Sequence, residues 1–343
     1  MCTLCLGEIA LKSTIKDIQR VTGLSLSTIS KYLNGGNLLD KNRALIDDAI
    51  CKLDFKVNQF ARSLKTNRSW TIGVLIPELN STFNTALIAN TEDILRQQGY
   101  GVIICDSRLD KDDETRALQF LVDKKVDGII TIPFDKSGGH LGLAKKENIP
   151  VILIDRLTTD FETDAVIVNN REISKAAICE MINKGHRKIG IISGPDKIYT
   201  MKERREGYRE ALSDNGIPYC KEWDITGDMS ITGGYNGFVK MMDNASRPSA
   251  VFLVNYEFTL GAVIAMNDKG IRIGNDISVI GFDNMELARV IKPKLTIVVQ
   301  PMADISKIAA ELIIKRLSFK EESPPEVIML KGKLEKGYSV QSI

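Results

Sequence analysis

Gly73-Val-Leu-Ile-Pro77 is an apolar run that ends at a proline, and Gly190-Ile-Ile-Ser-Gly-Pro195 repeats this pattern in the second half of the chain. Both belong to short, nearly continuous apolar stretches, which are typical of strands buried on both faces of a parallel sheet. Segments with helical periodicity lie between such stretches. Two similar openings of this kind predict two α/β lobes in series.

Runs of the same kind recur along the chain from residue 71 onward. The expected strands are residues 71–76, 101–105, 128–132, 151–154, 188–192, 223–225, 250–253, 277–280 and 295–299. Their alternation with helical patterns predicts βαβ units and therefore doubly wound parallel sheets. Because open α/β sheets bind ligands at the carboxyl ends of their strands, we expect a ligand cleft between the lobes. A helix at residues 302–317 is expected to return the chain to the first lobe.

Residues 14–56 show a different pattern, with short helices and tight turns. Thr14-Ile-Lys-Asp17 has the form of a capping box, Gly23 permits a turn, and Ser25 is placed to cap a second helix. A third helix is expected over residues 40–53. The apolar positions expected to face inward are Ile15, Ile18, Val21, Leu24, Ile29, Leu33, Leu45, Ile46, Ala49, Ile50 and Leu53. Two short helices joined by a glycine-containing turn predict a helix-turn-helix.

The second of these helices is expected to present a polar and basic face. Its outward positions are Leu26, Ser27, Ser30 and Lys31. In a helix-turn-helix the first residues of this helix reach base edges in the major groove, while Ser, Thr and Lys side chains bind phosphates. The alternative is a small helical subdomain whose polar face is only solvated.

The connector over residues 57–70 is polar and basic. Asn58 is a candidate cap for one or two helical turns, and Leu64 lies among Arg62, Lys65 and Arg68 with little core to bury it. An apolar side chain flanked by cations is what a minor-groove wedge requires. The alternative is that Leu64 packs on the first α/β lobe.

Composition and charge narrow the class of protein. The chain has 343 residues, of which 43% are apolar and 26% charged, which is typical of a soluble globular protein. Its net charge is only +2, but residues 1–69 contain eleven Lys and Arg against six Asp and Glu. This basic segment favours a polyanionic partner. No apolar run approaches the ~20 residues of a membrane span, and the N-terminus lacks the basic region of a signal peptide, so we expect a cytoplasmic protein.

Motifs for catalysis and metal binding are missing from the sequence. Six scattered cysteines indicate buried free thiols rather than disulfides, and Cys2-x-x-Cys5 has no second pair to complete a zinc site. His140 and His186 are the only histidines and lie far apart, so no catalytic triad is indicated. Walker, HExxH and GxSxG motifs are absent. We therefore expect no catalytic residue, no metal and no cofactor.

Together these motifs resemble the LacI/GalR family of transcriptional repressors. The resemblance is carried by ordered segments, which are Thr14–Ile18, Gly23–Lys31, Leu33–Gly35, Asn58–Lys65, Gly185–Gly190, Arg204 with Gly207 and Tyr208, and Ile280–Asn284. It implies a helix-turn-helix headpiece at 14–56, a hinge helix and linker at 57–70, and a periplasmic-binding-protein-like core at 71–343. In that core the first lobe would comprise residues 71–168 and 300–319, and the second lobe residues 169–299 and 320–340.

The resemblance implies a homodimeric repressor that binds a near-palindromic, double-stranded DNA operator. The residues that it assigns to DNA binding are Thr14, Ser25, Leu26, Ser27, Thr28, Ser30, Lys31, Asn34, Asn58, Ala61, Arg62, Leu64 and Lys65. Of these, Leu26, Ser27 and Lys31 would face bases, and Leu64 of each chain would enter the central minor groove. His186 would then belong to a helix-to-strand turn.

The resemblance also implies a small-molecule effector between the two core lobes. The residues that it assigns to effector binding are Phe83, Asp155, Asn169, Thr200, Arg204, Met229, Asn255 and Asp283. Carboxylates, a guanidinium and a flat apolar wall are suited to a polyol. Each has an alternative role: Asp155 and Asp283 as caps of strand ends, Arg204 as a surface helix residue, and Phe83 as core.

The identity of the effector does not transfer with the resemblance. Val168, Met229 and Tyr256 stand where the family commonly has other residues, so a sugar or sugar phosphate is only the family default. A solute-binding protein without a DNA-binding role is the competing interpretation, but it would lack residues 14–68. In the repressor interpretation, the ligand closes or twists the lobes and thereby changes hinge-helix pairing and operator affinity.

Overall fold

The computed structural model describes residues 13–33, 36–55, 68–283, 285–318 and 323–343. The chain divides into two compact units, Met1–Ser69 and Trp70–Ile343. Within the described residues, no helix is long and apolar enough to cross a membrane.

The described part of the first unit forms a bundle of three helices, α1 (Ile15–Thr22), α2 (Leu26–Leu33) and α3 (Asp40–Lys52). The Asp17 carboxylate accepts hydrogen bonds from the Thr14 N–H at 2.8 Å and the Thr14 hydroxyl at 2.7 Å, which fixes the start of α1. Gly23 ends α1 with a φ of 69°, a conformation that glycine adopts without strain. The Ser25 hydroxyl accepts from the Thr28 N–H at 3.2 Å and begins α2. These local contacts form the predicted helix-turn-helix.

The core of this bundle contains most, but not all, of the residues expected inside. Ile18, Ile29, Ile46 and Ala49 are fully buried at its centre. The expectation is wrong for Val21 and Leu45, which are 52% and 41% exposed. A helical turn takes 3.6 residues, so Val21, three residues after Ile18, lies to one side of the buried face of α1. Leu45 lies one residue before Ile46 and therefore to one side of the buried face of α3.

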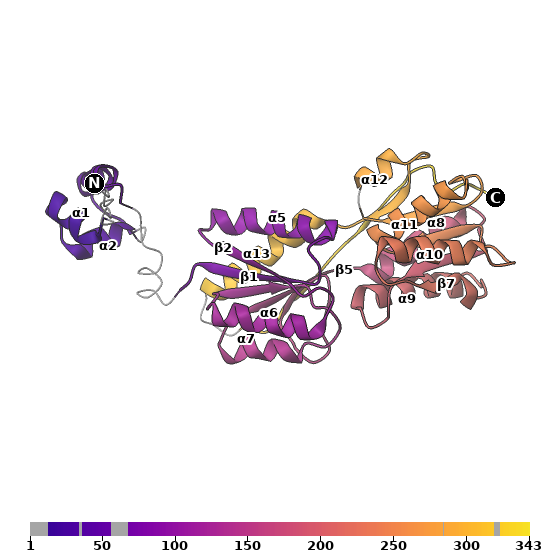
Figure 1. The fold of residues 1–343 in the computed structure, drawn as a ribbon, viewed down its shortest axis with the longest axis horizontal. Helices are drawn as coiled ribbons and strands as arrows, with labels where there is room; N and C mark the ends of the chain where they lie inside the picture. The colour runs from indigo at the N-terminus through magenta and orange to yellow at the C-terminus, as the bar shows by residue number, and fades with distance from the viewer. Residues whose placement is uncertain (1–12, 34–35, 56–67, 284, 319–322) are drawn as a thin grey trace, which may run out of the picture. The chain divides into compact units, whose positions relative to one another are not determined.

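The first lobe of the second unit is a six-stranded parallel sheet in the order β11-β5-β4-β3-β1-β2. Its strands are β1 (Thr71–Ile76), β2 (Gly101–Asp106), β3 (Gly128–Thr131), β4 (Val151–Ile154), β5 (Asp164–Val168) and β11 (Val327–Leu330). Helices α5 (Thr82–Gln97) and α13 (Met302–Ser318) cover one face of the sheet (Figure 1). Helices α6 (Lys111–Asp123) and α7 (Gly142–Lys146), with the 3-10 turn η1 (Gly139–Leu141), cover the other.

The second lobe repeats this architecture with the sheet order β12-β10-β9-β8-β6-β7, in which β12 alone of these six strands runs antiparallel to its neighbour. Its strands are β6 (Ile189–Ser193), β7 (Asp224–Thr226), β8 (Ala250–Leu253), β9 (Ser278–Phe282), β10 (Thr296–Val299) and β12 (Lys333–Glu335). Its helices are α8 (Asn170–Asn183), α9 (Tyr199–Asp214), α10 (Ile231–Met242), α11 (Tyr256–Asp268) and α12 (Met285–Val290), with the 3-10 turn η2 (Lys221–Trp223). Helix α8 packs on α9, and α10 packs on α11. Two doubly wound lobes and a small helical unit confirm the predicted fold class.

The expected boundary near the C-terminus is wrong for residues 327–330. They form β11, which extends the first sheet by pairing with β5, rather than part of the second lobe. Asp164 at the start of β5 explains this placement, because its carboxylate accepts from the Arg316 guanidinium at the end of α13 at 2.6 and 2.7 Å. The same carboxylate accepts from the Glu326 N–H at 2.8 Å. The chain therefore stays with the first lobe through β11 and enters the second lobe only at β12.

Within the described residues, the chain passes between the lobes after β5, after β10 and after β11. Asn169 joins the first and third of these crossings. Its N–H donates to Leu330 O at 3.0 Å, and its side-chain oxygen accepts from the Gly332 N–H at 2.9 Å. These crossings form the hinge between the lobes.

The described cysteines are free thiols, as expected, but they are not buried. Cys51 is exposed, and Cys105, Cys179 and Cys220 are partly exposed. Cys51 lies on the outer side of α3, more than a quarter turn away from the buried stripe of Ile46 and Ala49. Cys2 and Cys5 lie outside the described residues.

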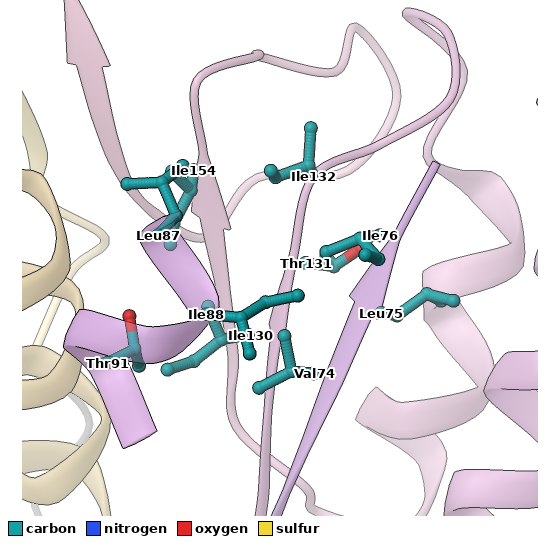
Figure 2. Close-up of a pocket in the computed structure, with 10 residues that line it drawn as sticks. All are labelled: Val74, Leu75, Ile76, Leu87, Ile88, Thr91, Ile130, Thr131, Ile132 and Ile154. Carbon is teal, nitrogen blue, oxygen red and sulfur yellow. The ribbon is translucent and has the colours of Figure 1, made fainter. Parts of the chain in front are cut away.

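A small apolar cavity lies inside the first lobe between α5 and strands β1 and β3 (Figure 2). Its volume is about 10 Å³, close to the minimum for one water molecule. Its lining is almost entirely aliphatic, with Val74, Ile88 and Ile130 among the side chains in Figure 2. It is a packing defect of the lobe core and is too small to hold an effector.

Thr131 borders this cavity and provides a stability test. It is 1% exposed, and its hydroxyl has no hydrogen-bond partner within the described part of the chain. A buried hydroxyl without a partner costs about 1–3 kcal/mol, so Thr131→Val is expected to stabilise the core by about 1 kcal/mol. Denaturant unfolding of the full chain measures the change. The control Thr85→Val removes an exposed hydroxyl that donates to Ser81 O and should not stabilise; a destabilised Thr131→Val protein would contradict the expectation.

Candidate DNA-reading face and effector cleft

The polar face of α2 points away from the core of the first unit. Leu26, Ser27 and Lys31 are exposed, whereas Ile29 on the opposite side of the helix is fully buried. The hydroxyls of Ser25 and Ser27 lie 2.8 Å apart. Thr14 is also exposed, and Thr28 and Ser30 are partly exposed. The arrangement therefore leaves the residues proposed for DNA contact open at the first turns of α2.

Several residues expected to bind DNA lie outside the described residues. They are Asn34, Asn58, Ala61, Arg62, Leu64 and Lys65. Their roles, including the minor-groove wedge, stay predictions from the sequence.

Each candidate effector residue follows the carboxyl end of a strand. In chain order these pairs are Phe83 after β1, Asp155 after β4, Asn169 after β5, Thr200 and Arg204 after β6, Met229 after β7, Asn255 after β8, and Asp283 after β9. In parallel sheets these ends meet at one edge of each lobe, which is where such sheets bind ligands. Asp155, Met229 and Asp283 have positive φ angles, and backbone strain of this kind is concentrated at binding sites.

Arg204 on α9 is the centre of this site. It is 3% exposed, so the alternative of a surface helix residue is wrong. Its Nε donates to Asn170 Oδ1 at 2.7 Å and its Nη1 to Val254 O at 2.6 Å, and the guanidinium lies 3.7 Å above the Phe282 ring centre. Burial lowers the pKa of Arg204, and the negative charges of Asp283 and Asp155 oppose this shift.

Asp283 is the second buried charge of the site. Both of its carboxylate oxygens accept from Gln300 Nε2, at 3.0 and 3.1 Å. Burial raises the pKa of Asp283 to about 6, against the opposing effect of the Arg204 charge. Its carboxylate bonds to a side chain here, not to the backbone of a strand end.

Besides the buried Arg156 Nε, three polar atoms of residues near Arg204 have no hydrogen-bond partner among the described residues. They are Asp155 Oδ1, Asn255 Nδ2 and Gln300 Oε1. Each belongs to a residue that is 5% exposed. The Asn255 amide is oriented because its oxygen accepts from the Phe258 N–H at 2.8 Å, and the Gln300 amide is oriented by Asp283. Because unpartnered buried groups are costly, these atoms mark the place where a ligand would supply the missing hydrogen bonds.

The remaining candidates contact the cores of the lobes or the hinge. Phe83 is partly buried against the core of the first lobe, and Met229 against the core of the second. Thr200 is buried in the first turn of α9. Asn169 uses its side chain at the hinge, where it bonds to Gly332 and to Glu172 at 3.0 Å.

Sequence reasoning missed four residues of the cluster, which are Arg156, Asn170, Phe282 and Gln300. Arg156 and Gln300 directly follow β4 and β10. Both are polar residues at strand ends, where parallel sheets bind ligands, so this pattern in the sequence could have found them. His186 is at a helix-to-strand turn as expected, with its ring nitrogens 2.8 Å from Ser249 Oγ and 3.1 Å from Gln341 O.

Known proteins are similar to this chain in sequence and in fold. The family of periplasmic binding protein-like domains matches residues 178–340. Catabolite control protein A of Priestia megaterium is 30% identical over 324 residues, which cover 94% of this chain and 97% of that protein. The chain belongs to the LacI family of transcriptional repressors. The relatives of this family that it matches are named as transcriptional regulators and not as enzymes.

Further LacI-family relatives agree with this assignment. The ribose operon repressor of Haemophilus influenzae is 31% identical over 312 residues, 91% of this chain and 94% of that protein. A solved LacI family regulator from Enterococcus faecium with bound ribose is 29% identical, with a TM-score of 0.72 over 80% of this chain and 99% of that one. The lac repressor dimer bound to operator and the anti-inducer ONPF shares the fold, with a TM-score of 0.85 over 97% of this chain and 100% of that one at 21% identity.

The raised pKa of Asp283 predicts how its substitution changes stability with pH. The folded state holds this proton up to about pH 6, whereas the unfolded carboxyl releases it near its ordinary value, so wild-type stability falls as pH rises between these values. Asp283→Asn removes this effect. The melting temperature of the variant minus that of wild type should therefore be larger at pH 7 than at pH 4.5. Asp276→Asn is the control, because the pKa of Asp276 is lowered to about 2 by Arg272. Equal differences at both pH values for Asp283→Asn would contradict the expectation.

Proposed function

We propose that this protein binds an operator as a homodimer and that a small neutral sugar in the cleft changes its affinity for DNA. The observation that carries the proposal is the cluster around Arg204. It combines the buried carboxylates of Asp155 and Asp283, the buried guanidinium groups of Arg156 and Arg204, and two oriented amides, Asn255 and Gln300, each with an atom that lacks a partner. Such a set is suited to a compact ligand with several hydroxyl groups.

The charges of the cluster favour a neutral ligand over a sugar phosphate. The charges of Asp283 and Asp155 attract the charge of Arg204. Arg156 Nε lies 3.5 Å from Asp155 Oδ2. Glu257 also acts on Arg204, and Glu114 and Glu78 act on Arg156. The two cations are thus already opposed by carboxylates, and a phosphate would add negative charge without a cation to balance it. Hydroxyl groups both donate and accept, so they match the unpartnered acceptors of Asp155 and Gln300 as well as the donor of Asn255.

Among neutral sugars, D-ribose is the first candidate. The ribose operon repressor of Haemophilus influenzae and the Enterococcus faecium regulator with bound ribose are both close relatives. Proteins named PurR are similarly related, at 30% identity. Overall likeness therefore does not decide the ligand; the chemistry of the cluster favours a neutral polyol, and the two relatives make ribose the first one to test.

On the DNA side, we propose that α2 lies in the major groove. Leu26, Ser27 and Lys31 would reach base edges, and Leu64 would enter the central minor groove. Three short helices contact only one half-site, so two copies would be needed for a near-palindromic operator. The sugar would act by binding one arrangement of the lobes more tightly than the other, with a coupling of about 1–3 kcal/mol.

The DNA-binding part of the proposal is tested by random-site selection with the full chain. A near-palindromic site should be enriched, and its affinity should fall steeply with salt. Lys31→Ala should weaken binding to that site by about tenfold, because it removes an exposed cation of α2. Lys52→Ala, an exposed cation of α3 paired with Asp48, is the matched control. Selection without any enriched sequence would contradict the proposal.

The effector part is tested by calorimetry with D-ribose and D-ribose 5-phosphate. Wild type should bind ribose and bind the phosphate at least about tenfold more weakly, because the phosphate leaves an unbalanced buried charge. Arg204→Met should abolish ribose binding while operator affinity in the absence of sugar is kept. Arg209→Met is the control on the same helix, since Arg209 pairs with Asp224 and Glu206 outside the cluster. Unchanged ribose binding by Arg204→Met would remove Arg204 from the site.

A further inference from the structure

We infer that Glu114 of α6 is a positioning residue of the effector cleft. Its carboxyl group holds the backbone at Phe134, and that backbone in turn orients the guanidinium of Arg156 beside Asp155. Glu114 itself belongs to the packed interior of the first lobe. The inference deepens the proposed function and rests on it, because Asp155 is one of the groups proposed to bind the sugar.

The contact between Glu114 and Phe134 is buried and specific. Glu114 Oε1 accepts from the Phe134 N–H at 2.8 Å, and Glu114 is 1% exposed. Phe134 lies in the loop that follows β3, whereas Glu114 lies in the first turn of α6. The bond therefore ties a loop at the carboxyl edge of the sheet to a helix that is already anchored in the core.

The same stretch of backbone supports Arg156 from the other side. Arg156 Nη1 donates to Pro133 O at 2.8 Å and to Phe134 O at 2.9 Å. Arg156 is 7% exposed, and its Nε lies 3.5 Å from Asp155 Oδ2. The position of the two carbonyls thus sets the position of the guanidinium, which in turn leaves Asp155 Oδ1 as the unpartnered oxygen of the cleft.

A buried carboxyl at position 114 is costly for the fold, which points to a specific role. Burial raises the pKa of Glu114 to about 7. Its second oxygen, Oε2, has no hydrogen-bond donor among the described residues and lies 3.3 Å from His140 Nε2. An apolar side chain would avoid this cost but would leave the Phe134 N–H without its partner. The oxygen that reaches Phe134 is therefore the feature that the site requires.

This role depends on the reach of the side chain and not on its charge, and two variants separate these properties. Glu114→Gln keeps an oxygen at the same distance from the backbone and loses the charge. Glu114→Asp keeps the charge but is one methylene shorter, so its oxygen falls short of the Phe134 N–H. Both substitutions change the size and polarity of the side chain only slightly, which limits the disturbance of the core.

Calorimetric titration of each full-length variant with D-ribose tests the inference, together with amide hydrogen exchange of Phe134 without sugar. Glu114→Gln should bind ribose within about threefold of wild type and keep the Phe134 amide protected. Glu114→Asp should bind about tenfold more weakly and exchange this amide faster. A merely structural role would lower the melting temperature of Glu114→Asp without weakening ribose binding by the folded protein.

The outcomes distinguish this inference from the proposed function. If wild type binds ribose and Glu114→Asp binds it equally well, the positioning role is overturned and the proposed function stands. Weakened binding by Glu114→Gln with normal binding by Glu114→Asp would assign the effect to charge and would also overturn it. A wild-type protein that binds no ribose would overturn the proposed function and this role together.

Discussion

The buried guanidinium of Arg204 is the constraint on which the candidate effector site depends. A charge taken out of water must be balanced by opposite charge and hydrogen bonds nearby. Here the second lobe supplies Val254 O, the Phe282 ring and Asp283, whereas the negative charge of Asp155 comes from the first lobe. The balance therefore involves both lobes, and any change in how the lobes close changes the environment of this one group.

The neighbouring groups connect this balance to the segments that cross between the lobes. Asp283 engages Gln300, which follows β10 directly before the chain returns to the first lobe. Asn170, which accepts from Arg204, directly follows the hinge residue Asn169. The site is thus built on the segments that cross between the lobes. A ligand that completes the hydrogen bonds of the cluster would stabilise one arrangement of these crossings over another, which is what an effector of a repressor has to do.

Much of this organisation was accessible from the sequence because it follows from local chemistry. Apolar runs located most of the strands, and Gly23 and Ser25 located the turn and start of α2, whereas Asp155 and Asp283 were expected from the family resemblance. Strand β11 was assigned to the wrong lobe, since its place depends on the contacts of Asp164 with Arg316 and Glu326 across the fold. Glu114 was missed for the same reason, because nothing in the pattern of α6 indicates that its side chain bonds to a loop after β3.

The central claim is that occupancy of the cleft by a neutral sugar changes the affinity of the protein for its operator. The most direct measurement is the fluorescence anisotropy of an operator obtained by selection, titrated with the full-length protein in the presence and absence of saturating D-ribose. The account predicts that the two dissociation constants differ by about 5–150-fold, as expected for coupling between two sites. Superimposable titration curves, for a protein that binds both the operator and ribose, would contradict it.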